Sequence, residues 1–232
     1  MASTMVWVPL ESNPEVMTKF IYTLGVPKSW AIVDVYGLEP DLLALVPKPV
    51  AAVILLYPLK VVKSDAPEEE PKEEVEEEVS DSDKSVYHIK QYVSNACGTI
   101  AIIHSVANNL DCIQLEDGFL KKFLEETKDL SFCERGKRLF NSTEISELHG
   151  ESALEGQTKA PDLLTPVNHH FVALVHKNGT LYELDGRKSA LIEHGSTSPE
   201  KFLEDAARVC KEYMARDPEE VGFTVMAMAQ TD

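Results

Sequence analysis

Residues 91–104 read Gln91-Tyr-Val-Ser-Asn-Ala-Cys97-Gly-Thr-Ile-Ala-Ile-Ile-His104, and this stretch places a thiol at the start of a predicted helix. Ser94 and Asn95 are turn-forming residues, whereas the residues after Cys97 are apolar or small. Backbone N–H groups at a helix N-terminus have no intrahelical partners and favour negative charge, so a cysteine there can hold more reactive thiolate. A buried structural thiol is the alternative, because free cysteine is among the most buried residue types.

The composition of the 232 residues favours a soluble intracellular protein. With 44% hydrophobic residues the chain can bury a full core. Its longest apolar run, residues 50–57, is too short to span a bilayer, and the first residues lack the pattern of a signal peptide. The four cysteines are widely spaced and form no CxxC pair, which fits free thiols in a reducing compartment. We therefore expect a location in the cytoplasm, with the nucleus as an additional location, and no membrane partner.

Much of the net charge of −17 is concentrated in one segment. Residues 65–83 contain eleven acidic side chains and one lysine, which gives −10. Such a low-complexity run cannot bury apolar surface, so we expect a mobile acidic loop over residues 64–84, either neutral to function or acting on partners. The excess of acidic residues argues against nucleic-acid binding, which needs lysine and arginine at the phosphates. It favours a neutral or basic partner.

Local patterns predict helices and strands without regular β-α-β alternation. The expected helices cover residues 14–24, 40–45, 97–109, 118–128 and 199–214, and the expected strands cover residues 31–36, 50–57, 170–176, 181–185 and 223–228. The polar stretch over residues 148–168 contains two glycines and two prolines and is predicted to be a long functional loop. The fold class is therefore α+β or mixed α/β, as a single domain over residues 1–232.

A cysteine nucleophile needs a histidine base and a group that orients this base. His170 opens the first strand of a predicted β-hairpin and Asp185 ends the second, so the two lie opposite or nearly opposite each other. Strand alternation sends the side chain of His169 to the other face. His104 lies two helical turns from Cys97, about 10 Å along the axis, which is too far for the base. A strand-end histidine and a turn aspartate are also common structural residues, so a structural pair remains the alternative.

Gln91 precedes Cys97 by six residues, and its side-chain amide could donate to an oxyanion together with the backbone N–H of Cys97. An ordinary surface glutamine is the alternative. A metal site is not expected, because the spacings of His169, His170, His176 and the cysteines match no zinc template. We therefore predict neither a metal nor an organic cofactor.

Five segments carry a joint pattern, namely Trp7-Val-Pro-Leu-Glu-Ser-Asn-Pro14, Val33-Asp-Val-Tyr-Gly37, Ser94-Asn-Ala-Cys-Gly-Thr99, Glu155-Gly-Gln-Thr158 and Leu181-Tyr-Glu-Leu-Asp-Gly-Arg187. In this order they resemble the ubiquitin carboxyl-terminal hydrolases, in particular the short, single-domain L-type isozymes. The similarity extends over residues 7–229. It implies a papain-like cysteine peptidase fold with a central, mainly antiparallel sheet flanked by helices, and a knotted backbone, which is rare among proteins.

The resemblance implies a deubiquitinating thiol hydrolase that acts at the C-terminal glycine of ubiquitin. Cys97 matches the nucleophile of the family, His170 the general base, Asp185 the acid that orients the base, and Gln91 the oxyanion stabiliser. Residues 148–168 match a crossover loop that straddles the active-site cleft and limits the adducts that can pass. Small or unfolded leaving groups are therefore expected.

The resemblance also implies a binding surface for ubiquitin, whose basic C-terminal tail suits an acidic protein. The matching residues are Pro9, Leu10, Glu11, Ser12, Asn13, Pro14, Ala153, Leu154, Glu155, Gly156, Gln157, Thr158, Glu220, Val221, Gly222, Phe223, Thr224 and Val225. Gly222 departs from the family pattern, in which a bulkier, often basic residue is usual. A monomer is expected. Two alternatives stay open: a non-catalytic ubiquitin-binding module, and a hydrolase that prefers a ubiquitin-like modifier such as NEDD8.

Overall fold

The computed structural model describes residues 6–59, 85–157 and 167–231 of the chain. Its helices and strands are α1 (Pro14–Thr23), β1 (Trp30–Asp34), α2 (Pro40–Leu43), β2 (Val50–Pro58), α3 (Cys97–Ala107), α4 (Phe119–Thr127), α5 (Phe132–Phe140), α6 (Thr143–Leu154), β3 (His169–Lys177), β4 (Thr180–Leu184), β5 (Ile192–Ser196), α7 (Phe202–Ala215) and β6 (Thr224–Gln230). No helix within these ranges combines the length and the hydropathy that a membrane span needs.

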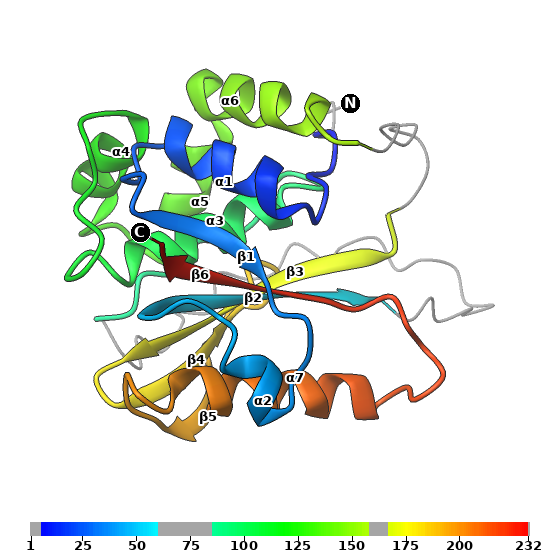
Figure 1. Cartoon of the computed structure of the whole chain (residues 1–232). Coiled ribbons are helices and arrows are strands. Elements are labelled where there is room, and N and C mark those ends of the chain that lie inside the picture. The colour runs from blue at the N-terminus through cyan, green and yellow to red at the C-terminus, as the bar shows by residue number, and fades with distance from the viewer. Residues whose placement is uncertain (1–5, 60–84, 158–166, 232) are drawn as a thin grey trace.

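One six-stranded sheet forms the centre of the described structure, in the strand order β1-β6-β2-β3-β4-β5 (Figure 1). All neighbouring strands in it pair antiparallel, as the resemblance implied. Helices α1, α3, α4, α5 and α6 cover one face of the sheet, and α2 and α7 cover the other (Figure 1). The chain therefore has the three-layer α/β arrangement expected of a papain-like fold.

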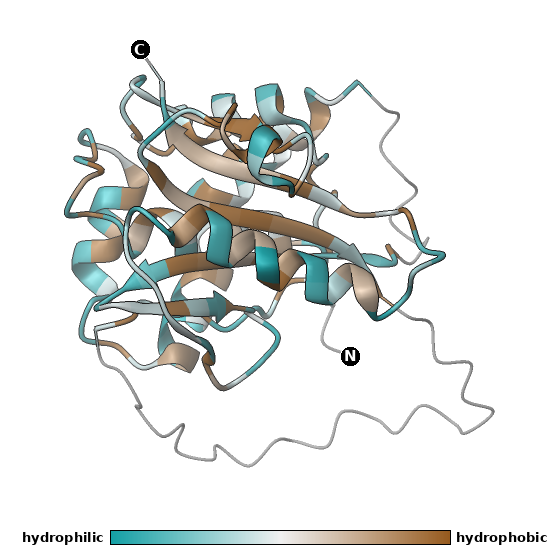
Figure 2. Cartoon of the chain, turned by 60° about the horizontal axis from the view of Figure 1, so that its bottom comes forward, coloured by the Kyte–Doolittle hydropathy of each residue, from teal (hydrophilic) through white to brown (hydrophobic). Residues whose placement is uncertain are grey.

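Both faces of the central strands are buried, which explains the continuous apolar runs in the sequence. Along β2, Ala52 and Ile54 belong to the core on the α3 side, whereas Val53 and Leu55 belong to the core on the α7 side. A strand that is covered on both faces needs apolar residues at every position. Figure 2 shows this distribution from the α7 side, with apolar central strands behind a helix whose outward face is hydrophilic.

Capping residues in the local sequence determine where α1 and α5 begin. Asn13 caps α1 by accepting the N–H of Glu15 at 2.9 Å, and Pro14 is the first helical residue, as predicted. Ser131 and Glu134 form a reciprocal capping box at the start of α5. The sequence analysis overlooked this Ser-x-x-Glu signal and predicted neither α5 nor α6 nor the short strand β5.

The predicted loop over residues 148–168 is wrong in its first part, because residues 148–154 are the final turns of α6. Ile145, His149, Ser152 and Ala153 recur at helical spacing and are buried. A Cβ at Gly150 would meet open space, so this glycine costs only its intrinsic propensity, about 1 kcal/mol relative to alanine. The prediction gave weight to the glycine and missed the buried stripe.

Several predictions fall on residues that the structure does not describe. Residues 158–166 of the predicted crossover loop lie outside the described residues, and so does nearly all of the acidic loop over residues 64–84. A knotted backbone depends on the path of both segments, so it stays a prediction.

Candidate active site

Cys97 is the first residue of α3, a helix that packs against β2 and β3. No side chain caps the N-terminus of α3 in the described structure, in contrast to α1 and α5. The unpaired backbone N–H groups at this helix end therefore favour negative charge where the thiol lies.

Asn95 makes the turn into α3 with a positive φ of 65°. Asparagine tolerates this left-handed conformation better than most residues do. Its Nδ2 donates to the carbonyl oxygen of Trp7 at 3.0 Å, and the N–H of Trp7 donates to the carbonyl oxygen of Ser94 at 3.1 Å. The N-terminal segment is therefore bonded to the turn that positions Cys97.

His170 and Asp185 form a buried pair at the end of the β3–β4 hairpin. Nε2 of His170 lies 2.7 Å from Oδ1 of Asp185, and the two side chains are 2% and 4% exposed. The register pairs Ala173 with Leu184, so its continuation places Asp185 opposite Val172, two residues from His170 on the same face. The structure thus brings the two residues together as a diagonal pair of the hairpin.

The charges around His170 favour its protonated form. Burial lowers the pKa of His170, but hydrogen bonds to Asp185 and Cys97 outweigh burial and raise this pKa to about 8. Because Nε2 bonds Asp185, Nδ1 is the ring nitrogen left to face the thiol of Cys97. Burial raises the pKa of Asp185, yet its hydrogen bonds with His170 and with the backbone N–H of Arg187 hold it below its ordinary value. An imidazolium at His170 is therefore stabilised by a carboxylate behind it.

A second buried carboxylate, on Glu183, lies two residues before Asp185 and supports the same face of the hairpin. Glu183 accepts hydrogen bonds from three side chains, namely Tyr213 Oη at 2.7 Å, His194 Nε2 at 2.9 Å and Lys188 Nζ at 3.1 Å. Tyr57 contacts the ring of Tyr213 at a tilt of 50° and meets the ring of His170 edge to face, with the Tyr57 and His170 centroids 5.7 Å apart. The sequence analysis missed these residues, because no local pattern distinguishes Glu183 from an ordinary strand residue.

Gln91 lies on a segment that contacts the turn after β4. Its N–H donates to the carbonyl oxygen of Gly186 at 2.8 Å. A Cβ at Gly186 would lie 2.8 Å from Cγ2 of Ile100, so only glycine lets the turn approach this closely. Nε2 of Gln91 donates to the carbonyl oxygen of Val93 at 2.9 Å, which leaves its second N–H for another acceptor.

Two buried histidines hold the segment that carries Gln91. Nε2 of His88 donates to the carbonyl oxygen of Asp185 at 3.0 Å, and Nε2 of His104 accepts the N–H of Ile89 at 3.0 Å. Burial lowers the pKa of His88 to about 4 and that of His104 well below its ordinary value. His104, which the sequence excluded as the base, is therefore a neutral core residue.

His149 links α6 to the helix that carries Cys97. Its Nε2 donates to the carbonyl oxygen of Val8 at 2.6 Å, so its Nδ1 must accept the hydroxyl hydrogen of Thr99 at 2.7 Å. Burial lowers the pKa of His149 to about 4. The helix before the predicted crossover loop is thus fixed to the first turn of α3.

We expect acid to destabilise the fold through these neutral histidines. His88, His104 and His149 take up protons more readily when unfolded, so their stabilisation is present above pH 6.5 and is lost as the pH falls. For His88 and His149 this loss continues down to about pH 4. The contribution of His170 to stability depends on pH in the opposite direction. Because its pKa is raised, His170 stabilises the fold below pH 6.5, and this contribution is lost as the pH rises through about 8.

Urea unfolding between pH 7 and pH 4 measures this effect in the parent and in His149→Gln. The variant should be less stable at pH 7 by about 1–3 kcal/mol, because buried partners lose a hydrogen bond. It should also lose less stability than the parent between pH 6.5 and pH 4. If the free energy of unfolding fell by the same amount in both proteins between pH 6.5 and pH 4, this account would be contradicted.

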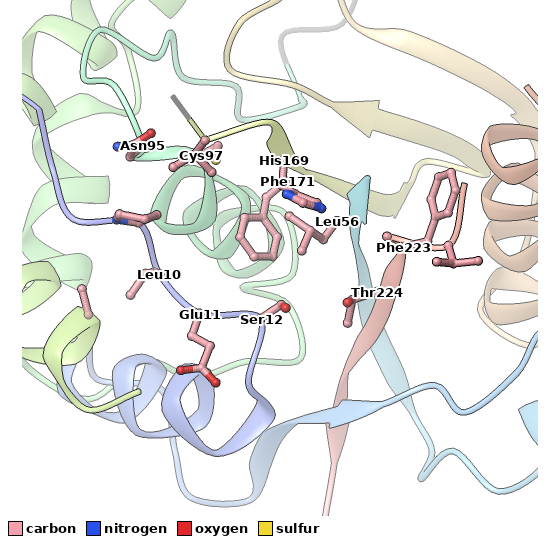
Figure 3. A pocket seen from close by; sticks show the side chains of 15 residues that line it. Leu10, Glu11, Ser12, Leu56, Asn95, Cys97, His169, Phe171, Phe223 and Thr224 are labelled. Carbon is pink, nitrogen blue, oxygen red and sulfur yellow. The ribbon is translucent and has the colours of Figure 1, made fainter. Parts of the chain in front are cut away.

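A cavity of about 500 Å³ lies beside Cys97 (Figure 3). Three segments that matched the ubiquitin contacts of the family line it, namely residues 9–12, Ala153 and residues 221–224. Figure 3 shows Leu10, Glu11 and Ser12 across the cavity from Phe223 and Thr224, with His169 and Phe171 between them. Segments that are far apart in the sequence thus surround one space next to the thiol.

Other predicted contact residues have structural roles. Asn13 and Pro14 begin α1, and Val225 is buried in the core on the α7 side. Gly156 packs against the carboxylate of Glu11, where a Cβ would clash.

The remaining predicted contact residues are more accessible. Leu154 and Val221 are exposed at 73% and 90%, which leaves two large apolar side chains free for a partner. Glu155 pairs with Lys19 at 3.0 Å, and Gln157 is exposed. Glu220 lines a second cavity, and Thr158 lies outside the described residues.

Residues that could hold a metal ion do not gather in the part of the chain that the structure describes. No group of three or more histidine, cysteine, aspartate or glutamate side chains is placed there to bind one.

Comparisons with known proteins show which proteins this chain is similar to. The model of a family described as ubiquitin carboxyl-terminal hydrolase, family 1, matches residues 7–215. A ubiquitin carboxyl-terminal hydrolase of Drosophila melanogaster is 51% identical, over 97% of both chains. The isozyme L1 of Rattus norvegicus is 41% identical, over 96% of this chain and 97% of that protein.

The fold is similar to a solved structure as well. The crystal structure of the Trichinella spiralis UCH37 catalytic domain bound to ubiquitin vinyl methyl ester matches with a TM-score of 0.75 and 27% sequence identity. The match covers 97% of this chain and 96% of that chain.

Proposed function

The chain belongs to family 1 of the ubiquitin carboxyl-terminal hydrolases and is a cysteine-type deubiquitinase, and we propose that Cys97, His170 and Asp185 carry out its reaction. The proposed reaction releases small or unfolded adducts from the C-terminal glycine of ubiquitin. The observation that carries this proposal is the buried His170–Asp185 pair, whose hydrogen bond of 2.7 Å fixes an imidazole whose pKa is raised, against the effect of burial, by Asp185 and by the nearby thiol of Cys97.

The first half of the proposed reaction forms a thioester. The thiol of Cys97 gives its proton to His170 and the sulfur attacks the carbonyl carbon of the terminal glycine, so that a C–S bond forms as the carbonyl oxygen becomes an oxyanion. The backbone N–H of Cys97 and the second Nε2–H of Gln91 stabilise this oxyanion. His170 then gives its proton to the leaving amine or thiol as the bond to the adduct breaks.

The second half regenerates the enzyme. His170, now neutral, takes a proton from a water molecule, which attacks the thioester carbon. The C–S bond breaks, the ubiquitin carboxylate leaves, and His170 returns the proton to the sulfur, which restores the thiol. Asp185 keeps Nε2 of His170 protonated and directed away from the thiol throughout, so Nδ1 remains available for proton transfer.

Two observations support ubiquitin as the substrate and a limit on adduct size. The cavity beside Cys97 is lined by the segments that match the ubiquitin contacts of the family, and the solved relative is bound to a ubiquitin derivative. Ala153 and Val167, which both belong to the predicted crossover loop over residues 148–168, also line this cavity.

Cleavage assays with two ubiquitin substrates test the proposal. The protein should hydrolyse a ubiquitin C-terminal fluorogenic amide, and it should cleave a substrate whose leaving group is a second folded ubiquitin much more slowly. Equal rates on both would remove the size limit from the proposal. No hydrolysis of the fluorogenic amide would overturn the proposed reaction itself.

A further inference from the structure

His169 is the neighbour of the proposed base, yet it faces a different environment. His170 is buried against Asp185, whereas the side chain of His169 is exposed at the start of β3. Strand alternation separates the two rings, so His169 lies on the same face of β3 as Phe171. This face borders the cavity that contains Cys97.

His169 and Phe223 form a wall between two cavities. Both residues line the cavity of about 500 Å³ beside Cys97 and the neighbouring cavity of about 770 Å³. In Figure 3 the imidazole lies between Cys97 on one side and Phe223 on the other. A substrate tail in the first cavity therefore lies close to this ring as well as to the thiol.

Gly222 makes the room that the His169 ring occupies. A Cβ at position 222 would lie 3.0 Å from Nε2 of His169 and 3.0 Å from Oε1 of Glu220, which is tighter than ordinary van der Waals contact. The φ of Gly222 is not in the left-handed region, so the backbone does not require glycine there. Oε1 of Glu220 also accepts the N–H of Gly222 at 2.8 Å, which holds the carboxylate over the glycine.

His169 has both polar and apolar neighbours: the carboxylate of Glu220 lies across Gly222 from it, and Thr224 lines the same cavity. Leu56, Phe171 and Phe223 line the cavity next to it. An imidazole in such surroundings can donate or accept a hydrogen bond, which its apolar neighbours cannot. The imidazole therefore favours a substrate tail that carries a hydrogen-bonding group at this position over a tail that lacks one.

We propose that His169 is a specificity-determining residue, whose imidazole contacts the substrate tail just before the terminal glycine. This inference rests on the proposed function, because it requires the tail of ubiquitin or of a ubiquitin-like modifier in the cavity beside Cys97. His169 takes no part in the proton transfers, which belong to His170. Its effect falls on binding of the tail and on the choice between tails.

Steady-state kinetics of four single variants and one double variant test the proposal, with fluorogenic amides of ubiquitin and of NEDD8 as substrates. His169→Leu removes the polar ring atoms at similar size, and His169→Gln retains a hydrogen-bonding group. Gly222→Ala places a methyl group against the ring. His176→Leu is the matched control, because His176 lies at the far end of β3 and lines neither cavity.

His169→Leu should raise KM for the ubiquitin substrate by about 2- to 10-fold, as expected for the loss of one hydrogen bond, with kcat within about twofold of the parent. The ratio of kcat/KM between the two substrates should change by a similar factor. His169→Gln should recover most of the loss, and the control should match the parent. Gly222→Ala should also raise KM, and its effect should be smaller in the presence of His169→Leu, because both changes act on one contact.

The outcomes separate this proposal from the proposed function. If KM and the substrate ratio of His169→Leu match those of the parent, the specificity role is overturned. A fall in kcat with unchanged KM would also overturn it, since His169 would then act through His170. A parent protein that hydrolyses neither amide would instead overturn the proposed function.

Discussion

Cys97→Ala should abolish hydrolysis of a ubiquitin C-terminal fluorogenic amide, with a loss of roughly 10⁶-fold in kcat, the size seen when a catalytic nucleophile is removed. The thioester cannot form without the sulfur, although the helix N-terminus and Gln91 could still bind the carbonyl oxygen. The fold should persist, because Cys97 is only partly buried and has no disulfide partner. Its melting temperature should stay within a few degrees of the parent value.

Cys112→Ala is the matched control for this prediction. Cys112 is also a free thiol, but it is exposed and lies beyond the C-terminal end of α3, away from the cavity. The control should keep full activity. Activity that survives in Cys97→Ala and disappears in Cys112→Ala would reverse the assignment of the nucleophile.

Asp185→Asn should lower kcat by about 10²- to 10⁴-fold while the protein stays folded. The carboxylate accepts the Nε2–H of His170 at 2.7 Å and stabilises the positive charge on the ring. An amide removes that charge and can present a donor to the ring, which favours the wrong tautomer. Oδ1 of Asp185 also accepts the N–H of Arg187 at 2.9 Å, so an amide that turns its NH2 group to the ring loses this bond to the turn after β4 as well.

We also expect Asp185→Asn to lower the pKa of His170. Burial lowers this pKa, and the interactions with Asp185 and Cys97 raise it to about 8. Without the carboxylate, the effect of burial on the pKa of His170 is no longer outweighed, so this pKa should fall toward or below its ordinary value of 6.5. NMR titration of the imidazole signals measures the shift directly. An unchanged pKa in Asp185→Asn would contradict the account, and Asp117→Asn, at an exposed ion pair, should leave the pKa of His170 at about 8.

The pairing of His170 with Asp185 could be inferred from the sequence because a hairpin is a local structure. The turn at Asn178-Gly179 fixes the register of β3 and β4, and the register fixes which side chains share a face. The central sheet and its buried runs were also predictable, since both follow from periodicity. The start of α3 could be predicted because polar, turn-forming residues precede Cys97 and apolar residues follow it.

Other parts of the site depend on contacts between distant segments. His149 bonds Val8 and Thr99, and Glu183 is buried because α7 supplies Tyr213. Such pairs leave no periodic signal in the sequence, so the sequence analysis gave these residues no role. The helical end of the stretch that begins at residue 148 was missed for a local reason, because Gly150 was given more weight than the buried stripe around it.

His169 shows how a correct local rule can hide a role. Strand alternation excluded it as the base, and its ring does point away from the His170–Asp185 pair. The same alternation places this ring at the cavity beside Cys97, where Gly222 leaves room for it. Only the folded structure brings these two residues together, because they are more than fifty positions apart in the sequence.

Reaction with a ubiquitin that carries a C-terminal vinyl methyl ester tests the central claim most directly. The electrophile occupies the position of the terminal glycine, so the attacking sulfur becomes covalently bonded to it. Peptide mapping of the adduct by mass spectrometry should locate a single ubiquitin on Cys97. An adduct on Cys112, Cys133 or Cys210, or no adduct at all on the folded protein, would contradict the assignment of Cys97 as the nucleophile.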